Sequence, residues 1–247
     1  MLRENLTADQ ALLTRRSVRA FLPTPVARAT VEELLLLAAR SPSGTNIQPW
    51  KVRVVAGEAR ERLCGAILAS LDRDGQAAHK RDWNYYPVSW REPFLSRRRK
   101  IGWDLYGLLG IRKGDFEATE RQRRRNFEFF GAPVGLIFTI DARLTAHSWL
   151  DLGLFVQNVM IAAKARGIDT CPQVSFARFH AIIASHLEMA AEEVTACGMS
   201  LGFANTAEPV NQLRMPRQGA QEFARMVGFE PPAAAGRERS SLVSLAN

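Results

Sequence analysis

Apolar residues recur along this chain with two periods, one typical of helices and one of strands. The helical period covers residues 5–13, 31–39, 58–71 and 148–163, and strand-like runs cover residues 50–55, 132–140 and 194–203. Two pairs spaced as in a capping box, Thr30 with Glu33 and Ser148 with Asp151, predict where two helices begin. Residues 170–175 are interpreted as a short turn before a further helix, with Ser175 as its N-cap. The chain is therefore expected to contain both helices and strands.

Two polar stretches interrupt this pattern. The basic segment, Arg15–Arg19, places three guanidiniums and a hydroxyl within five residues, which is chemistry suited to a phosphate. The polar loop, Ser41–Trp50, combines turn residues with small side chains, so its backbone can approach a planar ligand closely. Together they predict a nucleotide-type cofactor site. A glycine-rich dinucleotide fingerprint and a P-loop are both absent from the sequence, so arginines would hold the phosphate.

Arginine, tryptophan and tyrosine crowd into residues 72–124, which we call the aromatic insertion. Basic residues interleaved with aromatic ones can stack on nucleic-acid bases, although the sequence contains no named nucleic-acid motif. The same residues could form a helical excursion that covers an active site. They could also be only a solvated helix face.

Composition narrows the class of protein. With 247 residues and 47% hydrophobic content, the chain can form one substantial core or two small ones. Its net charge of +8 favours an anionic partner, which could be nucleic acid, an anionic surface or a phosphate-bearing small molecule. No apolar run approaches membrane-spanning length and the N-terminus has no apolar signal core, so we expect a cytoplasmic protein without membrane contact.

The cysteines and histidines give little indication of a disulfide, a metal site or a catalytic nucleophile. The three cysteines are widely spaced, and the four histidines form neither an HExxH motif nor a Cys/His cluster, so we expect no disulfide framework and no metal. Cys171 has no histidine near it in sequence and is interpreted as a small packed residue.

At this point the sequence resembles the FMN-dependent nitroreductases. The basic segment and the polar loop match that family, as do the helix 151–167, Cys171-Pro172-Gln173, and Leu201-Gly202-Phe203 with Arg217. The resemblance covers residues 11–55 and 126–229, while the aromatic insertion falls where such proteins vary most.

The resemblance implies an α+β fold with a central mixed β-sheet flanked by helices. It implies a single nitroreductase-like domain over residues 1–230, with the aromatic insertion as a lid. Residues 231–247 would form a tail that is poorly ordered or draped over a partner. It also implies an intertwined homodimer with two FMN sites at the subunit interface.

Site residues follow by position. The cofactor-binding residues would be Arg15, Arg16, Ser17, Arg19, Pro42, Ser43, Gly44, Asn46, Arg125 or Asn126, Pro172, Gln173, Val174, Ser175, Arg214 and Arg217. Residues 42–46 would reach the FMN site from the other subunit. Val174 departs from relatives that carry a carboxylate near this position, which weakens a side-chain role there but not a backbone one.

The implied activity is reduction of nitroaromatic or quinone-type acceptors by NADH or NADPH, with ping-pong kinetics. No catalytic side chain is needed because the cofactor carries the chemistry, and Arg19 would support the reduced flavin. Basic residues in the lid would favour small acidic acceptors such as nitrobenzoates. The alternatives are reductive dehalogenation or flavin fragmentation on the same fold, or a nucleic-acid-binding module.

Overall fold

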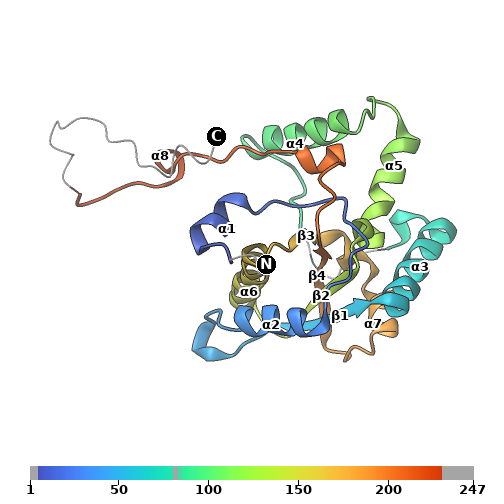
Figure 1. Cartoon of the computed structure of the whole chain (residues 1–247), viewed down its shortest axis with the longest axis horizontal. Coiled ribbons are helices and arrows are strands. Elements are labelled where there is room, and N and C mark those ends of the chain that lie inside the picture. The colour runs from blue at the N-terminus through green and yellow to red at the C-terminus, as the bar shows by residue number, and fades with distance from the viewer. Residues whose placement is uncertain (1–4, 80–82, 84, 230–247) are drawn as a thin grey trace. The chain divides into compact units, whose positions relative to one another are not determined.

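A four-stranded sheet lies between two groups of helices in the computed structural model, which describes residues 5–79, 83 and 85–229 (Figure 1). Contacts divide the chain into two units, Met1–Leu213 and Arg214–Asn247. The sheet of the first unit consists of β1 (Lys51–Ala56), β2 (Val134–Asp141), β3 (Asp169–Gln173) and β4 (Glu193–Gly202). Its helices are α1 (Ala8–Thr14), α2 (Arg28–Ala38), α3 (Gly57–Asp74), α4 (Phe94–Leu108), α5 (Phe116–Arg124), α6 (Ala146–Ala165) and α7 (His180–His186).

The strand order is β1-β2-β4-β3, and every neighbouring pair is antiparallel. The α+β class is confirmed, but the mixed sheet that we expected is antiparallel in these four strands. The reason is topological. Strands β2 and β3 run parallel to one another and are connected through α6, but β4 inserts between them and is antiparallel to both. A parallel pairing occurs at an isolated bridge between Ser17 and Thr170, beside β3.

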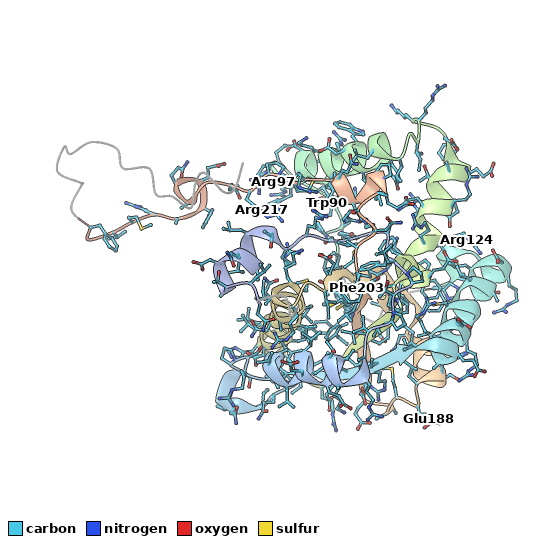
Figure 2. All side chains as sticks on the ribbon, in the orientation of Figure 1. Trp90, Arg97, Arg124, Glu188, Phe203 and Arg217 are labelled. Atoms are coloured by element: carbon cyan, nitrogen blue, oxygen red, sulfur yellow. The ribbon has the colours of Figure 1, made fainter. Side chains whose placement is uncertain are left out.

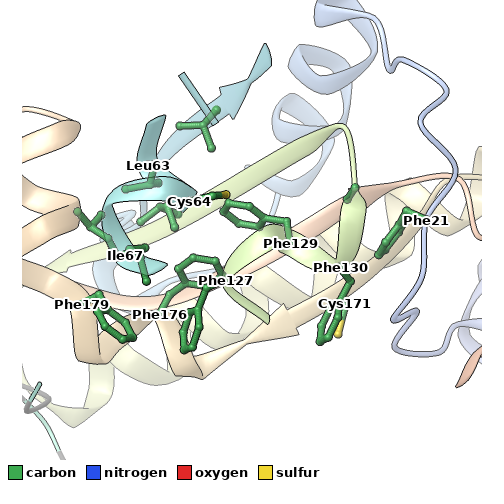
Figure 3. Packing of buried hydrophobic residues seen from close by; sticks show 14 of the residues in the cluster. Phe21, Leu63, Cys64, Ile67, Phe127, Phe129, Phe130, Cys171, Phe176 and Phe179 are labelled. Carbon is green, nitrogen blue, oxygen red and sulfur yellow. The ribbon is translucent and has the colours of Figure 1, made fainter. Parts of the chain in front are cut away.

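The sheet has a separate hydrophobic core on each face. Leu136, Phe138 and Ile140 of β2 pack with α2 and α6, whereas Ile137 packs on the opposite face with α3. On the α3 face, the rings of Phe129 and Phe176 stack with centroids 4.5 Å apart (Figure 3).

Two strand glycines make room for this stacked pair. A Cβ added to Gly135 would lie 2.4 Å from Cζ of Phe129, and one added to Gly198 would lie 2.4 Å from Cδ2 of Phe176. Glycine at these positions allows the rings to rest directly on the sheet.

Both capping-box predictions are wrong. Helix α2 begins at Arg28 and α6 at Ala146, and neither N-cap residue makes a side-chain hydrogen bond. The acidic partners are used in tertiary contacts instead. Glu33 pairs with Arg166 at 2.6 Å, and Asp151 accepts a hydrogen bond from the polar loop.

The turn expected at residues 170–175 is also wrong, because residues 169–173 form β3. Pro172 suggested a turn, but β3 lies at the edge of the sheet, where a proline is tolerated. The next segment, Val174–Phe179, is a 3-10 helix that runs into α7, so Ser175 lies inside it and is not an N-cap.

The aromatic insertion contains α4 and α5, so it is helical, as both the helical excursion and the solvated helix face required. The ring of Trp83 packs at a tilt against that of Trp149 of α6, with centroids 4.8 Å apart, and its Nε1–H donates to the carbonyl oxygen of Thr195 at 3.0 Å. Further along the chain, the guanidinium of Arg98 lies over the ring of Trp90 (labelled in Figure 2), 5.2 Å from the ring centre. The insertion is thus attached to the sheet and to α6 through one tryptophan.

The second unit is described only over residues 214–229, which include the short helix α8 (Ala220–Phe223). The tail predicted at residues 231–247 lies outside the described residues, and the single domain over residues 1–230 stays a prediction. Across the part of the chain that the structure describes, no helix is both long and apolar enough to span a membrane.

Candidate functional site

The basic segment runs beside β3. Ser17 forms the parallel bridge to Thr170, and the N–H of Val18 donates to the carbonyl oxygen of Thr170 at 3.0 Å. Val18 is fully buried and anchors the segment to the core. Arg15, Ser17 and Arg19 occupy alternate positions of this segment, and all three act on the thiol of Cys171. Two guanidiniums and one hydroxyl are thereby presented together at the edge of the sheet.

Cys171 of β3 lies close to these three side chains. Burial raises the pKa of its thiol to about 11, against the charges of Arg19 and Arg15 and a hydrogen bond from Ser17, which act in the opposite direction. The thiol therefore stays protonated at neutral pH and is not a nucleophile. The interpretation of Cys171 as a packed residue is confirmed.

A buried asparagine that the sequence did not reveal fixes the other side of the basic segment. Asn211 accepts a hydrogen bond from the N–H of Arg19 at 2.8 Å and donates to the carbonyl oxygens of Ala20 at 2.7 Å and Asn205 at 2.8 Å. It lies in the short 3-10 helix Pro209–Gln212 after β4. Nothing in its local sequence signals the contacts with Arg19 and Ala20, because these two residues lie 192 and 191 positions earlier in the chain.

The end of β3 is joined to the 3-10 helix Arg125–Gly131, which precedes β2. Gln173 is buried; its Oε1 accepts from Ser200 at 2.6 Å and its Nε2 donates to the carbonyl oxygen of Asn126 at 2.7 Å. Ser175 donates to Oδ1 of Asn126 at 3.4 Å. The side chain of Gln173 is therefore engaged in the fold, and a ligand would meet the backbone here.

A hollow of about 70 Å³ opens between Arg19 and Asn126. Its other lining residues come from α4, α5 and the 3-10 helix Arg125–Gly131, and they are Leu105, Tyr106, Gln122, Arg123 and Phe130. The structure thus brings together the basic segment, Asn126 and the aromatic insertion, which lie far apart in sequence. Of the two candidates before β2, Asn126 lines this hollow together with Arg19.

The predicted residues of the polar loop lie against α6, held by a different set of partners. The N–H of Gly44 donates to Oδ2 of Asp151 at 3.2 Å, and Nδ2 of Asn158 donates to Oγ of Ser41 at 2.7 Å. Pro42 and Asn46 are exposed, while Ser43 and Gly44 are half-buried. These four predicted cofactor-binding residues therefore lie in a segment that α6 supports, apart from the basic segment beside β3.

Arg214 and Arg217 belong to the second unit. Arg217 is exposed and its Nη1 donates to the carbonyl oxygens of Met215 at 3.1 Å and Pro216 at 3.2 Å. That Arg214 and Arg217 bind the same cofactor as the basic segment stays a prediction.

Metal-binding chemistry is absent from residues 5–79, 83 and 85–229, where no cluster of three or more histidine, cysteine, aspartate or glutamate side chains could hold an ion.

The fold and the arginine-lined edge of the sheet are those of a flavoprotein-type α+β family. The sequence model described as "Nitroreductase family" matches residues 12–203, and the chain belongs to this family. The resemblance seen in the sequence is confirmed.

Two curated relatives show how similar in sequence the chain is to named members of the family. It is 44% identical over 225 residues to a 4-nitrobenzoate reductase of Pseudomonas putida, covering 90% of this chain and 96% of the relative. It is 38% identical over 219 residues to a chloronitrobenzene nitroreductase of Comamonas testosteroni, covering 89% and 96%.

Solved structures agree with the fold. The FMN- and NADPH-dependent nitroreductase NfnB from Sphigopyxis sp. strain HMH superposes with a TM-score of 0.87 at 34% identity, covering 91% of this chain and 100% of that one. NfnB from Mycobacterium smegmatis, solved in complex with NADPH, gives a TM-score of 0.84 at 30% identity, covering 89% and 97%.

Proposed function

We propose that this protein is an FMN-dependent, NAD(P)H-oxidising reductase of nitroaromatic compounds. The observation that carries the proposal is the placement of the basic segment beside β3, through the bridge of Ser17 to Thr170, which brings Arg19 to one hollow with Asn126. The names of the relatives, 4-nitrobenzoate reductase and chloronitrobenzene nitroreductase, support the choice of acceptor.

The side chains present fit FMN. Arg15, Arg16 and Ser17 offer charged and neutral donors to a phosphate, while Arg19 and Asn126 offer donors to the polar edge of a flavin ring. When bound, FMN would supply hydride transfer, from NAD(P)H in one half-reaction and to the acceptor in the other. The contribution of this chain is to bind and orient. Arg19 would place a permanent positive charge where negative charge develops on reduction, held there by Asn211.

We also propose that the active form is a homodimer. Leu150 and Leu154 of α6 are 63% and 39% exposed, and α1, which packs on α6, exposes Leu12 and Leu13. Such a set of uncovered leucines fits burial against a second copy. In the dimer, Pro42, Ser43, Gly44 and Asn46 of one subunit would complete the FMN site of the other. A cytoplasmic location also stays a prediction.

Acidic acceptors fit the lid best. Tyr106 and Arg123 of the aromatic insertion line the hollow beside Arg19, so an aromatic carboxylate could meet both a ring and a guanidinium there. A nitrobenzoate is the simplest compound with this chemistry.

The visible spectrum of the purified protein is the first test. We expect a yellow protein that NADPH bleaches anaerobically and that 4-nitrobenzoate reoxidises. Turnover of 4-nitrobenzoate should exceed that of a halophenol, which separates nitroreduction from dehalogenation. A colourless protein that cannot be reconstituted with FMN would overturn the proposal, and salt-dependent retention of nucleic acid on a filter would point to the nucleic-acid alternative.

Arg217 supplies a residue-level test. Replacing it with Ala should weaken FMN retention with little effect on folding, because it would remove one charged donor to the phosphate. Arg225→Ala, in the same unit and also exposed, is the matched control. Equal FMN occupancy of the two variants after dialysis would show that Arg217 is not a phosphate ligand.

A further inference from the structure

The polar loop is strained. Thr45, Asn46 and Gln48 have φ angles of 49°, 60° and 49°, in the left-handed region that residues with a side chain rarely occupy. Three such residues within four positions cost free energy that must be offset by contacts elsewhere, and clusters of this kind are typical of ligand-binding segments.

The contacts that offset the strain come from two polar residues of α6. Asp151 is 4% exposed and its Oδ2 accepts from the N–H of Gly44, while Asn158, two helical turns further on, donates to Oγ of Ser41. The Ser41 hydroxyl in turn donates to the carbonyl oxygen of Ala38 at the end of α2, 2.7 Å away. The loop is thus attached to α6 at its start and at its bend.

The approach of loop to helix is close at Gly44. A Cβ there would lie 2.8 Å from Nε2 of His147 and 3.9 Å from Oδ2 of Asp151. A side chain at position 44 would have to displace either the His147 ring or the loop itself, at the point where the N–H of Gly44 meets Asp151.

We infer that Asp151, assisted by Asn158, is a positioning residue that holds the strained polar loop in its ligand-contacting form. Burying a carboxylate between α6 and the loop is costly, and an apolar residue would pack the helix as well. What the carboxylate adds is an acceptor for the N–H of Gly44. The inference rests on the proposed function, in which this loop contacts FMN across the dimer.

The experiment compares FMN affinity, kinetics and melting temperature for the purified holoenzyme and its variants. Asp151→Ala should weaken FMN binding by at least about tenfold, because the backbone N–H loses its charged acceptor. Asp151→Asn should stay within about threefold of wild type, because its amide oxygen can accept the same N–H. Gly44→Ala should reproduce the loss without altering the carboxylate.

Arg166→Ala is the matched control. It removes the ion pair between Arg166, which caps the C-terminal end of α6, and Glu33 of α2, at the end of α6 away from the loop. We expect a lower melting temperature with unchanged FMN affinity.

Wild-type FMN affinity in folded Asp151→Ala would overturn the inference, as would an Asp151→Asn variant as weak as Asp151→Ala. If Asp151→Ala does not fold, Gly44→Ala decides, and normal affinity in that variant would overturn the inference. If the wild type itself binds no FMN, the proposed function fails instead.

Discussion

Glu193 is the most strongly held carboxylate of the sheet and allows a quantitative prediction. It is buried at the start of β4 and accepts hydrogen bonds from Arg53 at 2.6 and 3.0 Å, from Thr139 at 2.6 Å and from Lys51 at 3.3 Å. The hydrogen bonds from Arg53 are the main reason that its pKa is lowered from 4.5 to about 2. A carboxyl whose folded pKa is depressed stabilises the fold above its unfolded pKa, and this contribution is lost as the pH falls through the folded pKa.

Lowering the pKa of Glu193 from 4.5 to about 2 corresponds to about 3 kcal/mol of stability at neutral pH, of which about 2 kcal/mol is lost between pH 7 and about pH 3. Glu193→Gln keeps the size of the side chain and removes the titration. Its unfolding free energy should therefore be lower than that of the wild type at pH 7 and fall less steeply with acid. Urea unfolding at several pH values measures both quantities. Parallel pH profiles for the two proteins would refute the reasoning.

Three further substitutions test the packing and the site. Gly198→Ala should destabilise the fold by about 1–3 kcal/mol because the new Cβ would collide with Phe176; Gly65→Ala, where a Cβ has open space in α3, should instead be neutral or stabilising by thermal melting. Cys171→Ala should retain nitroreductase turnover, since the raised pKa of about 11 keeps the thiol inert, and a dead but folded enzyme would contradict that assignment. Asn211→Ala should lower stability by about 1–3 kcal/mol and weaken FMN binding together, because three backbone groups lose their partner; loss of stability alone would separate Asn211 from the site.

Secondary structure was predictable where one signal dominated. The strand expected over residues 50–55 is β1 at Lys51–Ala56, and the helix expected over residues 58–71 is α3 at Gly57–Asp74. In α3 the apolar period and the burial agree, since Leu63, Cys64, Ile67 and Leu71 are all buried. The strand β3 was missed because Pro172 carries a strong local turn signal, and only the sheet order shows that it lies at an edge.

The site was predictable in its chemistry and not in its supports. The sequence alone indicates Arg15, Ser17 and Arg19, because three guanidiniums within five residues can be recognised without knowledge of the fold. Asn211 and Asp151 bind backbone groups 192 and 107 residues away. A single polar residue in a sequence does not indicate a partner that far along the chain. Asp151 even fitted a different local motif, the capping box, whose geometry α6 does not adopt.

Two supports of the same kind thus hold the two halves of the proposed FMN site. A buried side-chain oxygen accepts the N–H of Arg19 in the basic segment, and another accepts the N–H of Gly44 in the polar loop. Each fixes a backbone position, so the residues that would meet the ligand are oriented before it binds. Because the two supports stand on different elements, the segment after β4 and the helix α6, the basic segment and the polar loop can be disturbed separately. In the proposed dimer, each FMN would then depend on Asn211 of one subunit and on Asp151 of the other.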